Sequence, residues 1–265
     1  MRPVPPPAAV QPLRGSETSL ELRGAAVMQT VMQRAAEALM ATRPEAIVTV
    51  GGGNADLALK ALIVGVCEVA MATSELPDDW RSAAADRAVK LSRVDVFRDA
   101  IVPVVDPRNP VEDLSLADLR RIFRGAITNW RDVGGEDAPI VLVSHEHHTG
   151  YYETFRERVM GAEAVILTSA KIVPGSEYAG AITGNAIGYL GFRRTAGRKA
   201  LSVGGVRPSI ATLKDESYPI HRTSSLWLRE PHSKLADALV QLVASATGQA
   251  IIDEEGFLPS PASAP

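Results

Sequence analysis

Strand-like and helix-like patterns alternate along the first third of the chain, and this alternation restricts the fold more than any other feature. Apolar residues recur at helical spacing from Val27 to Leu39, and two hydroxyl residues in front of them are interpreted as a helix cap. A buried strand is predicted over residues 46–50, followed by a glycine turn at 51–53, a second helix and another strand near Cys67. Helices that alternate with strands in this way favour an α/β fold with a central sheet.

Two long strand patterns divide the rest of the chain. Residues 99–105 and 218–227 are predicted to be strands that carry the chain between two α/β lobes. Residues 15–100 together with 218–265 would form lobe 1, residues 101–217 would form lobe 2, and residues 1–14 are a Pro-rich stub. In lobe 2 a helix is predicted after Ser115, its cap, and the C-terminal residues 233–256 are predicted to form one helix.

Charge and hydropathy argue against two classes of protein. The 28 Lys and Arg nearly balance the 31 Asp and Glu, so the net charge of −3 offers no basic surface for nucleic acid. No run of about 18 apolar residues is present, so no membrane-spanning helix is predicted. The stub lacks the apolar core of a secretion signal. Two alternatives stay open: a cytosolic protein, or an exported one from which a signal or lipid anchor was removed.

Three predicted helix starts are rich in glycine and in hydroxyl or amide side chains. They are RGSETS, GGGNAD and HHTGYYETF. Such residues satisfy the first backbone N–H groups of a helix, and the same N–H groups can hold an anion. Each start is therefore interpreted as an ordinary cap or as one part of an anion site.

The third start is preceded by a histidine cluster, from His145 to His148 with Glu146 inside it. Imidazole and carboxylate groups suit transition metals. In an extended segment, however, His145 and His147 point to one side and His148 to the other, so no metal is expected. A ligand contact by His145 and a solvated loop remain the two alternatives.

A longer set of motifs runs through residues 109–140. It comprises Asn109-Pro110, Leu114-Ser115, Ile122-Phe123, Gly125, Ile127-Thr128-Asn129-Trp130, Val133-Gly134-Gly135 and Pro139-Ile140. Together these motifs resemble the phosphate-binding proteins that serve ATP-driven phosphate importers. Similar matches at GSETS, PGSEYAGAITGNAIGYLGF, VRPSIATLKDESYPIHR and GQAIIDEEGFLP extend the resemblance from about Gly15 to Pro259. It implies an α/β fold of the two-lobed, type II periplasmic-binding-protein class, with mixed sheets and a ligand cleft between the lobes.

The resemblance also implies four ligand loops, and this chain departs from the family in most of them. The implied ligand residues are Ser16, Thr18, Asn54, Asp56, Thr73, Ser74, His145, Thr149, Gly150 and Tyr151. Asn54 and Asp56 stand where the family has Gly-Ser-Gly, and Ser74 stands where it has a charged residue. His145 replaces an arginine, and it carries a positive charge only when it is protonated, with an unperturbed pKa near 6.5.

The leading hypothesis is a solute-binding protein that closes on phosphate, a related oxyanion or another small polar ligand for an ABC permease in the membrane. The chain is then expected to be a monomer in the periplasm or attached to the cell envelope, without cofactor, metal or nucleic acid. The alternatives are a ligand sensor or a cytoplasmic enzyme on the same fold, with His145, Asp56 and Tyr151 as the reacting groups.

Overall fold

The computed structural model describes residues 17–147, 149–161 and 169–260, and these residues divide into two compact units. Unit 1 comprises Met1–Phe97, Thr223–Glu255 and Pro259–Pro265, and unit 2 comprises Arg98–Arg222 and Gly256–Leu258. The chain passes between the units within two long strands, β4 (Leu91–Val105) and β11 (His221–Arg229). A short third passage places Gly256–Leu258 in unit 2, whereas the sequence assigns this segment to lobe 1.

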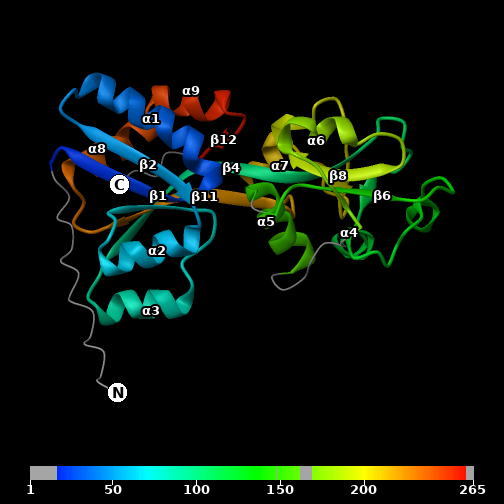
Figure 1. Ribbon diagram of the computed structural model, residues 1–265, viewed down its shortest axis with the longest axis horizontal. Helices are drawn as coiled ribbons and strands as arrows, with labels where there is room; N and C mark the ends of the chain where they lie inside the picture. Colours follow the sequence, from blue (N-terminus) through cyan, green and yellow to red (C-terminus); the bar gives the residue numbers. More distant parts are fainter. Residues whose placement is uncertain (1–16, 148, 162–168, 261–265) are drawn as a thin grey trace, which may run out of the picture. The chain divides into compact units, whose positions relative to one another are not determined.

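Unit 1 is a sheet with helices on both faces (Figure 1). β1 lies between β2 and β3 and pairs in parallel with both, and β3 pairs antiparallel with β11. The helices α1, α8 and α9 pack together over one face, and α2 and α3 lie on the other (Figure 1). The elements are β1 (Ser19–Ala25), α1 (Gln29–Thr42), β2 (Ile47–Gly53), α2 (Ala55–Val64), β3 (Val69–Ala72), α3 (Asp78–Asp86), α8 (Lys234–Ala244) and α9 (Ala246–Glu254).

Unit 2 is built around the second half of β4, which pairs antiparallel with β8, while β8 pairs in parallel with β6. Phe155 of α5 stacks on Tyr189 of β8 at 4.0 Å between ring centroids, within the core of this unit. The other strands and α-helices that lie in this unit are β5 (Asp113–Leu114), α4 (Leu116–Phe123), β6 (Val141–Ser144), α5 (Gly150–Phe155), β7 (Lys171–Ile172), α6 (Gly175–Ala181), β8 (Ala186–Gly191), β9 (Lys199–Ala200), β10 (Ser202–Val203) and α7 (Ile210–Lys214). The short strand β12 (Leu258–Pro259) begins in unit 2 and ends in unit 1.

The first element of the chain differs from the prediction. Residues 19–25 form strand β1, whereas Thr18 before them was expected to cap a helix. The buried Leu20 and Leu22 alternate with the more exposed Glu21 and Arg23, which is the two-residue period of a strand with one buried face. The helix itself begins only at Gln29.

The C-terminal helix is also different, because it is two helices that meet at Ser245 with a bend of 65°. The Ser245 hydroxyl donates to the Leu242 carbonyl and accepts from the Gly248 N–H, so it closes α8 and caps α9. Within the described ranges no single helix is long and apolar enough to cross a membrane. Only this bent pair, taken together, meets the length and composition required.

Candidate functional site

In unit 1 three parallel strands end side by side, and polar residues follow two of them. The register places Ala25 of β1 opposite Gly53 of β2, and Gly24 opposite Met71 of β3. Asn54 comes directly after β2, and Thr73 directly after β3. In open α/β sheets, ligands bind outside the carboxyl ends of the strands. This edge is therefore the candidate binding edge of unit 1.

The polar side chains at this edge are partly available to a ligand. The Asn54 side chain accepts from the Leu57 N–H at 3.0 Å and so caps α2, with Asp56 exposed in the first turn. Thr73 and Ser74 are half-buried, and in the described residues their hydroxyls have no hydrogen-bond partner. Asn54, Asp56, Thr73 and Ser74 thus follow neighbouring strands of one sheet edge. This set contains no positive charge.

Thr18 belongs to the other end of the same sheet, which corrects its expected place in the first ligand loop. Its carbonyl accepts from the Ile47 N–H, next to the first residue of β1. The seven residues of β1 span about 20 Å, at about 3.3 Å per residue, and separate Thr18 from the binding edge. Ser16 lies outside the described residues. The loop that follows β1 begins with Ala26, which has no hydroxyl.

One residue at the binding edge, Gln29, is not among those predicted from the sequence. Gln29, the first residue of α1, is half-buried and lies over the backbone of Gly52. A Cβ atom at Gly52 would lie 2.1 Å from the Gln29 side-chain oxygen, so this position has to be glycine for Gln29 to lie there. The strand pattern of residues 19–25 could have revealed Gln29. A strand over these residues places the first ligand loop at the carboxyl end of the strand, close to Gln29.

In unit 2 the expected ligand histidine is a packed interior residue. His145 follows β6 and is 3% exposed, with its ring stacked on Tyr178 at 3.5 Å and on Tyr151 at 5.0 Å between centroids. Its Nε2 lies 3.1 Å from the Tyr189 carbonyl, which identifies Nε2 as the nitrogen that carries the proton. Burial lowers the pKa of His145 to about 4, although the Tyr189 carbonyl opposes this shift. His145 is therefore neutral near pH 7 and does not supply the positive charge that it would carry when protonated.

The next three expected residues form the start of α5. Thr149 caps the helix, because its Oγ1 accepts from the Tyr152 N–H at 3.3 Å and donates to the Glu146 carbonyl at 2.9 Å. Gly150 is the first helical residue. The Tyr151 hydroxyl lies against Gly191, where a Cβ atom would lie 3.0 Å from it. Thr149, Gly150 and Tyr151 are thus brought together with His145, and Tyr151 packs on the protein interior.

The neutral His145 should make the stability of the protein fall as the pH drops from 7 to 5. The unfolded chain binds a proton at about pH 6.5, whereas the folded protein binds it only near pH 4. The unfolded state therefore holds more protons in this window, and the free energy of unfolding should fall by about 2 kcal/mol.

Urea unfolding at several pH values measures this effect. The control is His145→Phe, which keeps a planar ring in the stack and should lose about 2 kcal/mol less over the same window. Equal pH dependence in the two proteins would contradict the assignment of the effect to His145.

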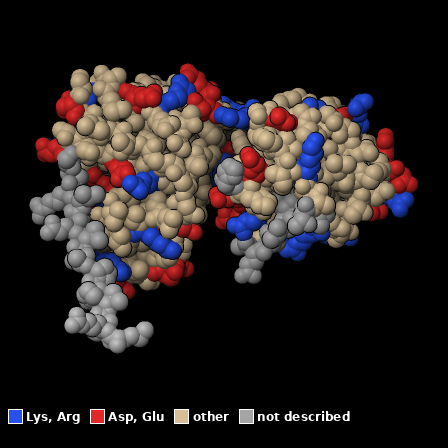
Figure 2. Space-filling model, in the orientation of Figure 1, with Lys and Arg blue, Asp and Glu red and all other residues tan. Residues whose placement is uncertain are grey.

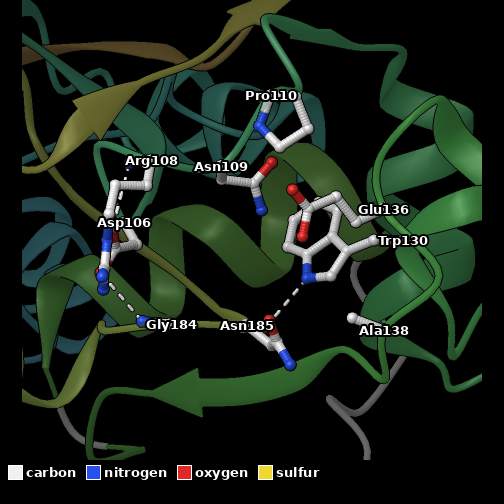
Figure 3. Close-up of a pocket in the computed structure, with 9 residues that line it drawn as sticks. All are labelled: Asp106, Arg108, Asn109, Pro110, Trp130, Glu136, Ala138, Gly184 and Asn185. Carbon is white, nitrogen blue, oxygen red and sulfur yellow. Dashed lines mark hydrogen bonds and ion pairs between the residues drawn. The ribbon is translucent and has the colours of Figure 1, made fainter.

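The motif residues that carry the family resemblance line a different feature of unit 2, a cavity of about 340 Å³ (Figure 3). The Trp130 Nε1 donates to the Asn185 carbonyl at 2.9 Å. Asp106 accepts from Arg108 and from the Gly184 N–H. The Trp130 and Gly184 bonds join segments far apart in the sequence, whereas the Arg108 bonds are local. The pKa of Asp106 is held below its usual range, chiefly by the Arg108 guanidinium. The bonding of these groups to one another favours a structural role.

Charged side chains of both signs are interspersed over the surface of each unit on the face shown in Figure 2.

Within residues 17–147, 149–161 and 169–260, no group of three or more His, Cys, Asp or Glu could hold a metal ion. His147 is exposed and lies over the Tyr152 ring at 4.6 Å, whereas His148 lies outside the described residues.

Two α/β units joined through long strands, with polar loops after parallel strands, define the class of two-lobed, type II periplasmic binding proteins. The profile of the family described as the PBP superfamily domain matches residues 8–247, and the chain belongs to this family. The predicted α/β, two-lobed fold is thereby confirmed.

Individual relatives agree. The phosphate-binding protein PstS of Bacillus subtilis is 28% identical over 248 residues, which are 91% of this chain and 80% of that protein. A candidate phosphate ABC transporter substrate-binding protein of Clostridium perfringens, solved with bound phosphate, is 28% identical with a TM-score of 0.71, covering 92% of this chain and 100% of that one. An ABC-type phosphate transport receptor of Vibrio cholerae is 23% identical with a TM-score of 0.83, covering 91% and 99%.

Proposed function

We propose that this chain is a solute-binding protein that takes phosphate or a closely related oxyanion for ABC import. The observation that supports this most is the similarity, over nearly the whole chain, to a solved protein of this type that contains phosphate. The likeness to PstS of Bacillus subtilis covers a similar share of the chain. On this proposal the protein works in the periplasm or attached to the cell envelope, with a membrane permease as its partner.

The candidate residues support an oxyanion ligand bound mainly by neutral donors. Each unit by itself has neutral donors: unit 1 has the hydroxyls of Thr73 and Ser74, the Asn54 loop and the Gln29 amide, and unit 2 has the loop from Thr149 to Tyr151. Hydrogen bonds to a charged ligand each contribute about 1.5–3 kcal/mol. Asp56, exposed beside Asn54, would repel a dianion and would favour a ligand oxygen that still carries a proton.

The enzyme alternative gains no support from the geometry. It needs His145 to exchange a proton near neutral pH, and burial lowers the pKa of His145 to about 4. The His145 ring stacks on Tyr178 and on Tyr151, and its Nε2 lies at the Tyr189 carbonyl.

Calorimetric titration with inorganic phosphate, with sulfate as comparison, tests the proposal. Phosphate is expected to bind and to raise the melting temperature. Thr73→Val and Ser74→Ala should each weaken phosphate binding by about 10-fold or more, because each removes one donor to a charged ligand.

The matched control is Ser82→Ala on α3, whose hydroxyl donates to the Asp78 carbonyl and which should leave the affinity unchanged. Phosphate binding that is absent between pH 5 and pH 8 would rule out the proposed ligand. Because His145 is neutral, its protonation is not expected to strengthen binding between pH 8 and pH 6.

A further inference from the structure

A buried arginine at the boundary of unit 2 contacts the loop that carries the proposed ligand residues. Arg222 is the last residue of unit 2 before the chain passes on through β11, and it is 2% exposed. Its Nη1 donates to the Gly150 carbonyl at 2.9 Å and to Thr154 Oγ1 at 2.6 Å. Its Nη2 pairs with Asp99 at 3.3 Å, while in the described residues its Nε has no partner. The guanidinium thus connects β11 to the first turn of α5.

The second anchor of this arrangement is Asp99 on β4, close to the other passage between the units. Asp99 is 3% exposed, and its second oxygen accepts from the Ala100 N–H at 2.8 Å. A buried ion pair contributes little net stability, because removing both charges from water offsets their attraction. Its geometry, in contrast, is restrictive, because the planar guanidinium donates in fixed directions. This favours a positioning role for the pair over a purely stabilising one.

Aromatic stacking holds the same loop from the other side. The Tyr151 ring stacks on His145 at 5.0 Å between centroids, and the Arg222 guanidinium lies over the same ring, with its Cζ 5.9 Å from the ring centroid. His145 in turn stacks on Tyr178 of α6. Successive contacts thus link Tyr178, His145, Tyr151 and Arg222, and we call these four residues the stacking column. It joins α6, the loop after β6, the start of α5 and β11.

The geometry points to Arg222 as the positioning residue of the Thr149–Tyr151 ligand loop, acting through the Gly150 carbonyl and the Tyr151 ring. This inference rests on the proposed function, because it assumes that the loop contacts the ligand. The N–H and C=O of a trans peptide point in opposite directions. By fixing the Gly150 carbonyl, Arg222 also fixes the direction of the Tyr151 N–H. Arg222 lies outside the Thr149–Tyr151 loop and orders it. Before this loop, at the position where the family has an arginine, this chain has the neutral His145.

Arg98 provides a matched control within the same unit. Arg98 donates to the Lys214 carbonyl at 2.7 Å and pairs with Glu216 at 3.0 Å, and its Nε, like that of Arg222, is buried without a partner among the described residues. Neither of these two contacts of Arg98 involves the ligand loop. Arg222→Lys and Arg98→Lys make the same chemical change: both keep the positive charge and lose the planar set of guanidinium donors. The two variants therefore differ only in the groups that the original arginine contacts.

Phosphate titration of the two lysine variants is the first test. Arg222→Lys should weaken phosphate binding by about 10-fold or more, because a single ammonium group cannot hold both the carbonyl and Asp99. Thr154→Val should weaken it by a few-fold, since it removes the hydroxyl between Arg222 and Gly150. Arg98→Lys should bind as the wild type does. Folded Arg222→Lys with wild-type affinity would overturn the inference.

Amide hydrogen exchange separates this inference from the proposed function. The Tyr151 and Tyr152 amides should exchange faster in Arg222→Lys than in the wild type, and at unchanged rates in Arg98→Lys, with no ligand present. If the wild type binds no phosphate, the proposed function fails, and this exchange still decides the positioning role. Equal exchange rates in the two lysine variants would refute it.

Discussion

Replacing Arg222 by methionine should lower the free energy of unfolding by about 3–5 kcal/mol, the usual effect of breaking a buried ion pair. Asp99 would be left buried without its paired cation, since its side chain is 4% exposed. Burial already raises the pKa of Asp99, and the nearby Arg222 opposes that shift. The Gly150 carbonyl and Thr154 would also lose a donor.

Chemical denaturation of unit 2 measures this loss, with Arg98→Met as the control for removing a less buried ion pair. The double variant Asp99→Leu with Arg222→Met should recover most of the stability, because it replaces both charges by apolar groups. It should not recover the positioning of the ligand loop. A loss of less than about 1 kcal/mol in the single variant would show that the pair is solvated in solution.

The strand and helix alternation was sufficient to predict the class of fold, because hydrophobic periodicity reports which face of an element is buried. It failed at β1 for a physical reason. The segment from Ser19 to Ala25 has only two apolar residues at a two-residue spacing before the helical pattern starts. A motif resemblance at Gly15 to Ser19 then assigned the ligand loop to the wrong end of that strand. The parallel register with β2 corrects it.

The candidate site was harder to predict than the fold, because it depends on contacts between segments far apart in the chain. Burial keeps His145 neutral by lowering its pKa, and the residues that bury it include Tyr178 and Tyr189. No local pattern around residue 145 contains this information. Arg222 was assigned to a strand motif, and its bonds to the start of α5 join residues 72 apart in the sequence.

Gly24→Ala should lower the free energy of unfolding of unit 1 by at least about 3 kcal/mol. Gly24 has a φ of +136°, a conformation in which L side chains are strained. An added Cβ atom would lie 2.0 Å from the Met71 carbonyl oxygen, so β1 and β3 would have to separate. The same movement would displace the loops that hold Ala26 and Thr73, and phosphate binding should be lost together with stability.

Gly51→Ala on the neighbouring strand is the matched control. Its Cβ atom would meet its nearest neighbour, the Leu22 carbonyl oxygen, at 3.8 Å, an ordinary contact, and its backbone is not in a strained region. Its free energy of unfolding should change by less than about 1 kcal/mol. Thermal and chemical denaturation of both variants, followed by phosphate titration of whatever remains folded, checks the pair. Equal stability of the two variants would mean that β1 and β3 are not in close contact at Gly24, and the binding edge of unit 1 would then have to be reassigned.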